Sequence, residues 1–249
     1  MTDQKRFAIV VPSYKNAKYY FRNLASALTQ NYENYHVLYT DDQSPDNTGN
    51  LVEDYLKKYD KKGRVKLVKN EQRIGALANL YNMIHSCDDD EIVITLDGDD
   101  WLAHPNVLNS LNKVYQDPNT WLTYGQYRSF PDNRIGCSRD VPANVKQQGS
   151  YRSYRWCSSH LRSFYSWLFK KIKKEDLMKD GKFYPMTWDL AMMFPMMEMA
   201  GMNHRFVSEV LYMYNYETPL NDAKVNLQLQ QGLEREIRAK KPYARIEGK

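Results

Sequence analysis

Residues 91–101 read Glu-Ile-Val-Ile-Thr-Leu-Asp-Gly-Asp-Asp-Trp, an apolar run that ends abruptly in acids. Residues 92–96 are rich in β-branched side chains, carry no charge and are too few for a helix, which favours an interior strand of a parallel sheet covered on both faces. Ligands bind at the carboxyl ends of the strands in such sheets. The stretch therefore predicts an α/β fold in which Asp97, Asp99 and Asp100 lie at the ligand-binding edge.

Three carboxylates this close together repel one another unless a cation or hydrogen-bond donors neutralise them. Hard oxygen ligands select Mg²⁺ or Mn²⁺, so a divalent metal site is the first inference. The alternative is an acidic loop that only caps the helix expected to begin near Pro105. The rest of the chain must decide between these two interpretations.

The composition sets broad limits on class and partners. The chain has 249 residues, 42% of them hydrophobic, which is enough for one large domain or two closely packed halves. Lys and Arg total 35 against 30 Asp and Glu without a polybasic block, so we do not expect a nucleic-acid partner. Cys87, Cys137 and Cys157 lack metal-ligand spacing, and their odd number argues against a disulfide framework.

The chain shows no membrane or export signal. No apolar stretch approaches the roughly 20 residues of a membrane span. Residues 1–6 lead straight into a strand pattern without the apolar core of a signal peptide. We therefore expect no membrane partner and a cytoplasmic location.

Strand and helix patterns alternate in the first half with short connections, which is typical of βαβ units and a mostly parallel sheet. Strands are expected at 7–12, 35–40, 65–68, 92–96 and 121–127, and helices at 17–30, 47–59, 76–86 and 106–115, with Pro105 at the first position of the last one. Residues 132–150 predict a long loop. A helix at 187–200 interrupted by Pro195, a strand at 206–214 and a helix at 222–240 complete the chain.

Polar clusters directly follow four of the predicted strands. They are Pro12-Ser13-Tyr14, the run from Asp41 to Thr48, the run from Asn70 to Asn79, and Asp97-Gly98-Asp99-Asp100. All four would gather at one sheet edge, and four independent clusters there are much harder to explain as helix caps than one is. The arrangement suits a nucleotide diphosphate held through its base, its ribose and a metal on the phosphates.

These residues resemble the nucleotide-sugar glycosyltransferases of the GT-A fold, specifically family 2-like enzymes. The motifs are Val11-Pro-Ser-Tyr14, Asp41-Asp42-x-Ser44-x-Asp46-x-Thr48, Arg73-x-Gly75-x-x-x-Asn79 and Leu96-Asp-Gly-Asp-Asp100, in family order over about the first 130 residues. The resemblance implies a Rossmann-like, mostly parallel sheet flanked by helices, with a less regular acceptor half. It implies one domain over 1–249, with a nucleotide-sugar-binding half at 1–105, an acceptor half at 106–220 and a C-terminal helix at 221–249.

The resemblance also implies a donor site for a UDP-sugar with Mn²⁺ or Mg²⁺. Tyr14 would pack on the uracil ring, Asp42 would accept from its imide N–H, and Arg73 would contact the base or its neighbours. Asp97 would hold the ribose and reach the metal, and Asp99 would bind the metal. Asp100 would be either a further ligand or a helix cap, and Pro12, Ser13 and Gly98 complete the donor site. The alternatives are a core aromatic for Tyr14 and a surface ion pair for Arg73.

One stretch of this sequence resembles the acceptor-side motif of such enzymes, namely Thr187-Trp188-Asp189-Leu190. Family members usually show Glu-Asp here, and Trp188 takes the place of the Glu. Asp189 remains where an inverting enzyme keeps the general base that takes the proton from the acceptor hydroxyl. The alternative for Asp189 is a cap on the methionine-rich helix that follows.

Three further features resemble a narrower group, the small glycosyltransferases of giant DNA viruses, some of which glycosylate collagen-like proteins. They are Ser159-His160-Leu-Arg162, the run from Phe194 to Gly201, and Tyr214-Asn215-x-x-x-Pro219-Leu-Asn221-Asp222-x-Lys224. This resemblance implies a hexose donor such as UDP-glucose, hydroxylysine or galactosyl-hydroxylysine as acceptor, and the host cytoplasm as location. Trp156, His160, Arg162 and Trp188 would line the acceptor groove, and Lys224 would cover the diphosphate. An α-linked glucose on galactosyl-hydroxylysine would require retention, which leaves Asp189 without the role of an inverting base.

Two other classes of function compete with this interpretation. A nucleotidyltransferase that makes nucleotide sugars shares the fold and a metal, but it usually has a Gly-rich loop with a basic residue after the first strand, which Val11-Pro-Ser-Tyr-Lys15 lacks. A non-catalytic protein could hold an extended polymer on the basic aromatic segment 151–171. The acids Asp97 and Asp99 would then have no task. The sugar, the acceptor, the anomeric outcome and the oligomeric state stay open.

Overall fold

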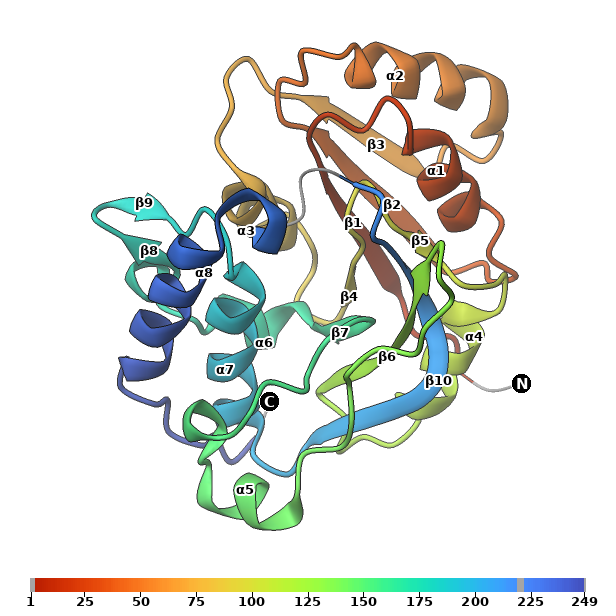
Figure 1. Ribbon diagram of the computed structural model, residues 1–249. Coiled ribbons are helices and arrows are strands. Elements are labelled where there is room, and N and C mark those ends of the chain that lie inside the picture. Colours follow the sequence, from red (N-terminus) through yellow and green to blue (C-terminus); the bar gives the residue numbers. More distant parts are fainter. Residues whose placement is uncertain (1–2, 219–221, 249) are drawn as a thin grey trace.

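The computed structural model describes residues 3–218 and 222–248, without the side chains of residues 222–225. In this part of the chain, one eight-stranded sheet carries helices on both faces (Figure 1). Its strands, in spatial order, are β3 (Val65–Lys69), β2 (Tyr35–Asp41), β1 (Phe7–Ser13), β4 (Ile92–Thr95), β7 (Arg162–Tyr165), β6 (Leu122–Phe130), β10 (His204–Asn215) and β5 (Trp101–Leu102). A small separate hairpin joins β8 (Met178–Lys179) to β9 (Lys182–Phe183).

The four strands from the first half are parallel, as the sequence predicts. β1 pairs with β2 on one side and with β4 on the other, and β2 pairs with β3. The order β3-β2-β1-β4 follows from helical crossovers between successive parallel strands. The predicted α/β class with a large, mainly parallel sheet is therefore confirmed.

Helices cover both faces of the sheet, which is why its central strands are apolar throughout. On one face lie α1 (Tyr20–Leu28), α2 (Thr48–Tyr59) and α4 (Val107–Val114), and on the other lie α3 (Ala76–His85), α6 (Ser166–Lys170), α7 (Trp188–Ala200) and α8 (Asp222–Ala239) (Figure 1). In β1, Phe7 and Ile9 join the first core and Ala8 and Val10 join the second. The alternation of side chains along a strand produces this division.

The second part of the sheet is mixed rather than parallel. β7 runs antiparallel to both β4 and β6, and β5 runs antiparallel to β10, whereas β6 and β10 are parallel. The sequence did not predict β7 or β5, because four and two residues are too few to show a period. As a result of its direction, β7 begins with Arg162 beside Thr95, at the same edge where β4 ends.

Three local predictions were wrong. α4 begins at Val107 with Asn106 as its N-cap, so Pro105 lies before the helix. The predicted loop 132–150 contains α5 (Ala143–Gln148), which is followed by the short 3₁₀ helix η1 (Tyr151–Ser153); a second 3₁₀ helix, η2 (Lys174–Leu177), precedes β8. Pro195 does not interrupt α7, because residues 190–200 are buried on all sides and packing outweighs the lost N–H.

Candidate functional site

The carboxyl ends of β1, β2, β3 and β4 meet at one edge, which we call the donor edge. Backbone hydrogen bonds join the segments just beyond the strands: Asp42 N–H donates to Ser13 at 2.8 Å, Asn70 N–H to Asp41 at 2.9 Å, and Leu96 N–H to Val10 at 3.0 Å. The four polar clusters therefore lie together in space, as their positions after the strands predict.

Asp42 is the most completely hydrogen-bonded acid of the donor edge. It is 2% exposed. Its Oδ1 accepts from the Asn70 amide at 2.8 Å and from the Ile74 N–H at 2.9 Å, and its Oδ2 accepts from the Gly75 N–H at 2.8 Å. Burial by itself raises the pKa of Asp42, but these donors outweigh it and hold the pKa below its usual range. The carboxylate thus shapes the loop between β3 and α3 and stays ionised.

Tyr14 is a surface platform rather than a core aromatic. Its side chain is partly exposed, the Arg73 guanidinium lies 3.9 Å from its ring centroid, and the Lys15 ammonium lies 5.4 Å away. A cation on the face of a tyrosine is attracted by the ring quadrupole. Arg73 and Tyr14 come from different strand ends, and the structure brings them together as the donor-site prediction requires.

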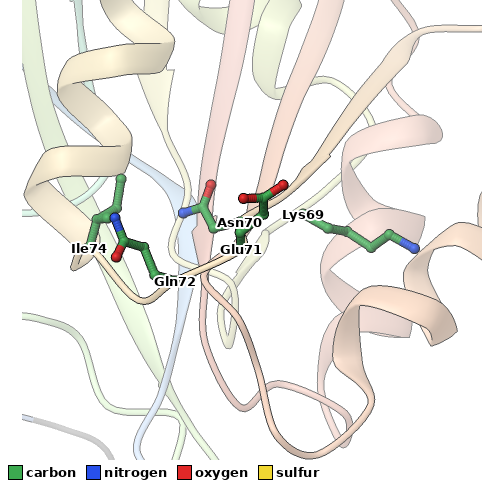
Figure 2. Close-up of a pocket in the computed structure, with 5 residues that line it drawn as sticks. All are labelled: Lys69, Asn70, Glu71, Gln72 and Ile74. Carbon is green, nitrogen blue, oxygen red and sulfur yellow. The ribbon is translucent and has the colours of Figure 1, made fainter.

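A pocket of about 570 Å³ opens beside Asp42 and lies within the size range of small-molecule sites. The last residue of β3 and four residues of the loop that follows line it, as Figure 2 shows: Lys69, Asn70, Glu71, Gln72 and Ile74. Asn70 and Ile74 are also the residues whose N–H groups bind Asp42. The pocket and the buried carboxylate are therefore parts of one structural unit.

The loop that carries the three acids is held tightly against α1 and β1. The fully buried Asn23 of α1 donates to the carbonyl oxygens of Asp97 at 2.9 Å and Asp100 at 2.8 Å. At Gly98 a Cβ atom would come within 2.4 Å of the Asn16 amide nitrogen, so only glycine fits between the acids and the end of β1. This packing explains the glycine between Asp97 and Asp99.

Asp100 differs from the other two acids. It is 2% exposed, its Oδ1 accepts from the Asn215 N–H at 2.7 Å, and its Oδ2 accepts from the Tyr212 hydroxyl at 2.7 Å. Burial, followed by repulsion from Asp99 and Asp97, raises the pKa of Asp100 well above its usual range. Asp100 ties the acid loop to β10, and the helix-cap interpretation is wrong because α4 begins elsewhere.

Asp97 and Asp99 are the two acids of this loop that reach the surface, and both are partly exposed. Burial raises the pKa of Asp99, although a hydrogen bond from the Thr218 side chain acts in the opposite direction. Burial thus disfavours the ionised form of Asp99, which a hard divalent cation bound to this carboxylate would stabilise, and Asp97 offers a second carboxylate on the same loop. These residues therefore fit the predicted metal.

The acceptor-side residues His160, Arg162, Trp188 and Asp189 lie together, and Arg162 is at their centre. Its Nη2 lies 3.2 Å from Asp189 Oδ2 and 3.4 Å from His160 Nε2, and its guanidinium carbon lies 5.4 Å from the centroid of Trp188. Asp189 is in the first turn of α7, and its side chain is 22% exposed. The structure thus joins four predicted residues from two separate stretches of sequence.

An aromatic cluster that the sequence analysis did not use connects His160 to the acid loop. The His160 ring stacks on Tyr212 with centroids 4.4 Å apart, and Tyr212 donates to Asp100. Burial, and then the neighbouring Arg162, lower the pKa of His160 well below its usual range, so the imidazole is neutral. The signal in the sequence was Tyr212-x-Tyr214-x-Tyr216, whose spacing of two places side chains on one face of a strand.

Three other predicted site residues have different surroundings. Trp156 packs edge-on against Phe194 of α7 with centroids 5.5 Å apart, so its described contact is with the core. Pro12 is buried in β1, opposite Thr40. The side chain of Lys224 lies outside the described residues.

A second group of side chains of the kind that binds metals lies at the amino-terminal edge of the sheet: His36, Cys87 and Glu91. The Arg6 guanidinium already binds Glu91, with Nε 3.0 Å from Oε1. Burial raises the pKa of the Cys87 thiol to about 12. The group is therefore an ion-pair network that joins β1, β2 and β4, remote from the donor edge.

The family model of glycosyl transferase family 2 matches residues 8–193. A curated relative, the UDP-Glc:alpha-D-GlcNAc-diphosphoundecaprenol beta-1,3-glucosyltransferase WfgD of Escherichia coli, is 31% identical over 134 residues, which is 53% of this chain. The chain spans 50% of the length of that relative. In the described residues no helix has the length and apolar character needed to cross a membrane.

Solved structures share the fold. The structure of Staphylococcus aureus TarS 1-349 in complex with UDP-GlcNAc has a TM-score of 0.67 at 16% identity, covering 93% of this chain and 65% of that 1-349 chain. The mannosyltransferase PcManGT from Pyrobaculum calidifontis, in complex with GDP-Man and Mn²⁺, has a TM-score of 0.59 at 19% identity, covering 97% of this chain and 67% of the other. At such identities the likeness establishes the GT-A architecture of the sheet and helices.

Proposed function

The chain belongs to glycosyl transferase family 2, and on that premise we propose that it moves a hexose from a UDP-sugar to an acceptor hydroxyl with the help of Mn²⁺ or Mg²⁺. One observation carries the proposal. Two partly exposed acids, Asp97 and Asp99, stand on a rigid loop at the same edge as Tyr14, Arg73 and the pocket beside Asp42. These groups together fit a nucleoside diphosphate with a bound cation.

The donor would lie along this edge from the base to the diphosphate. Tyr14 offers a ring for stacking on the uracil. Asp42 is 2% exposed and its oxygens already accept from three N–H groups, so we assign it the shaping of the pocket beside the base. Asp97 would hold the ribose and Asp99 the cation, with Asp97 as a second ligand. When bound, the cation would neutralise the charge that develops on the leaving diphosphate. We leave Asp100 out of the metal ligands, because both of its oxygens are engaged by β10.

Asp189 would act as the general base. It would take the proton of the acceptor hydroxyl while that oxygen attacks the anomeric carbon. The name of the Escherichia coli relative describes a β-glucosyl transfer from UDP-Glc, which supports glucose as the donor sugar and inversion as the outcome. The same relative acts on a diphosphoundecaprenol-linked sugar, so for an inverting reaction we propose a glycan or the hydroxylysine of a collagen-like protein as the acceptor. Galactosyl-hydroxylysine is the acceptor only of a retaining reaction, in which Asp189 would not be the base.

The donor proposal is tested by incubating the purified protein with UDP-glucose, UDP-galactose, UDP-GlcNAc and GDP-mannose, with Mn²⁺ or EDTA, and measuring thermal stabilisation and sugar release. We expect one UDP-sugar to stabilise the protein only with Mn²⁺. Asp99→Ala should lower its turnover at least about 100-fold, since the cation supplies several kcal/mol to the transition state. Asp54→Ala, which removes an exposed acid from α2, is the matched control.

Equal turnover in the wild type and Asp99→Ala would contradict the metal site, and no stabilisation by any donor would contradict the whole proposal. The acceptor is then sought by mass spectrometry with the best donor. Collagen peptides and short glycosides are offered separately, and the added hexose is located on one or the other.

A further inference from the structure

Arg162 is a buried cation at the junction of the two halves of the site. Its side chain is 3% exposed, and its Nη2 lies 3.2 Å from Asp189 Oδ2. Its Nε and Nη1 are buried without a hydrogen-bond partner in the described structure. Burying a guanidinium is costly unless the charge is paired, so the ion pair with Asp189 is what makes this position tolerable.

The backbone of Arg162 is fixed by its neighbours in the sheet. Arg162 pairs with Thr95, two residues before Asp97, in the antiparallel ladder between β4 and β7. The next residue, Ser163, is fully buried, and its hydroxyl lies 2.9 Å from the Tyr115 hydroxyl and 2.6 Å from the Thr123 hydroxyl. A short strand anchored in this way holds the start of the Arg162 side chain at a set distance from the acid loop.

We propose that Arg162 is a positioning residue for the transfer reaction: it holds the Asp189 carboxylate directed at the acceptor hydroxyl, in a fixed relation to the donor acids. The inference rests on the proposed function, in which Asp189 is the general base. It adds Arg162 as the residue on which the position of that base depends. It also gives the unpredicted strand β7 a purpose, since β7 is the element that joins the end of β4 to the first turn of α7.

The surroundings of Arg162 favour a single anionic partner. His160, at 3.4 Å, is neutral because of its burial, and so it adds no second charge. The ring of Trp188 lies 5.4 Å from the guanidinium and offers it an aromatic face. A carboxylate at position 188 would compete with Asp189 for Arg162, whereas a tryptophan leaves the pair intact. Arg162 on β7 is thus the charged group that pairs with Asp189, and the neutral His160 lies next to Arg162.

The chemical step balances with these groups. The proton of the acceptor hydroxyl passes to a carboxylate oxygen of Asp189, the hydroxyl oxygen forms a bond to the anomeric carbon, and the bond from that carbon to the diphosphate oxygen breaks with its electron pair leaving on the diphosphate. Asp189 then releases this proton to solvent before the next cycle.

The test compares Arg162→Gln with Arg162→Lys and with the matched control Arg155→Gln, an exposed arginine of the same segment. For Arg162→Gln we expect kcat for transfer to fall roughly 10- to 100-fold through misplacement of the base. KM for the UDP-sugar should stay at the wild-type value, because the misplaced group acts on the acceptor and not on the donor. Arg162→Lys keeps a cation beside Asp189 and should restore kcat to an intermediate value.

Binding of the UDP-sugar, measured by calorimetry, should stay within about twofold of wild type in all three variants, since Arg162 acts on the acceptor side. A kcat of Arg162→Gln equal to that of the wild type would overturn the inference, and so would a loss of donor binding equal to the loss of kcat. If Arg162→Gln does not fold, the kcat of Arg162→Lys decides, and a kcat equal to that of the wild type would contradict the role. Failure of the wild type to bind any UDP-sugar is a separate result and would reject the proposed function instead.

Discussion

The donor edge and the acceptor side hold their carboxylates in different ways. At the donor edge Asp42, just after β2, is surrounded by N–H groups of the loop between β3 and α3, and these donors outweigh burial and hold its pKa below the usual range. At the acceptor side Asp189 depends on one ion pair, with Arg162 of β7. The donor-edge carboxylate is therefore held by several donors from one loop, and the acceptor-side carboxylate by a single buried side chain. Substitutions should affect the first mainly through binding and stability, and the second mainly through the rate of transfer.

The largest effect is expected at the acceptor side. Asp189→Asn should lower transfer about 10²- to 10⁴-fold, because an amide cannot take up the acceptor proton. Binding of the UDP-sugar should be unchanged, since the donor edge is intact. Initial rates with saturating donor, together with calorimetry, check this, and Asp90→Asn at an exposed position is the control. Transfer at the wild-type rate would show that Asp189 is not the base and would favour a retaining reaction.

The next largest effect is expected for substitution of Asp42, which should lower the free energy of unfolding by an amount that depends on pH. The pKa of Asp42 is lower in the folded protein than in the unfolded chain, so its stabilisation is present above the ordinary carboxyl range, near pH 4, and is lost as the pH falls through the folded-state pKa. Asp42→Asn should lower the free energy of unfolding by about 1–3 kcal/mol at pH 7, because a donor then faces the Gly75 N–H.

Urea unfolding of metal-free protein at pH 7, 5 and 3.5 measures this difference. The gap between wild type and Asp42→Asn should narrow below about pH 4. A gap that stays constant over this range would mean that the ionised carboxylate contributes nothing through its N–H donors. Asp54→Asn, at an exposed position of α2, should show little difference from wild type at each pH.

The smallest effect is expected for the aromatic platform. Tyr14→Ala should weaken binding of UDP by up to about tenfold, the usual worth of one aromatic stacking contact. Tyr14→Phe keeps the ring and should bind as wild type does. Tyr59→Ala removes a tyrosine that is 47% exposed on α2, away from the donor edge, and serves as control. Unchanged binding in Tyr14→Ala would remove Tyr14 from the donor site.

The donor edge could be predicted from the sequence because each of its groups follows a strand directly. Residues 92–96 form an uncharged, mostly apolar run, and the acids follow it directly. The same short stretch of sequence therefore predicts both the end of the strand and the position of the site. The same is true of Ser13 at the end of β1 and Asp42 after β2. The parallel order of the strands then brings these positions together without further information.

The acceptor side could be predicted only as a set of residues. The sequence analysis named Arg162 and Asp189, but the contact between them depends on β7, four residues that insert antiparallel between β4 and β6. Nothing periodic marks so short a strand. The roles of Asn23 and Tyr212 were missed for the same reason, because both reach the acid loop from elements distant in sequence.

The central claim is that Asp99, rather than the buried Asp100, binds the cation beside a UDP-sugar at the donor edge. The most direct measurement is a crystal structure of the protein with UDP and Mn²⁺, with anomalous scattering recorded at the manganese edge. The account predicts an anomalous peak bound to the Asp99 carboxylate and the diphosphate, with the uracil at Tyr14. A peak held by Asp100, or ordered UDP at this edge with no manganese, would contradict it.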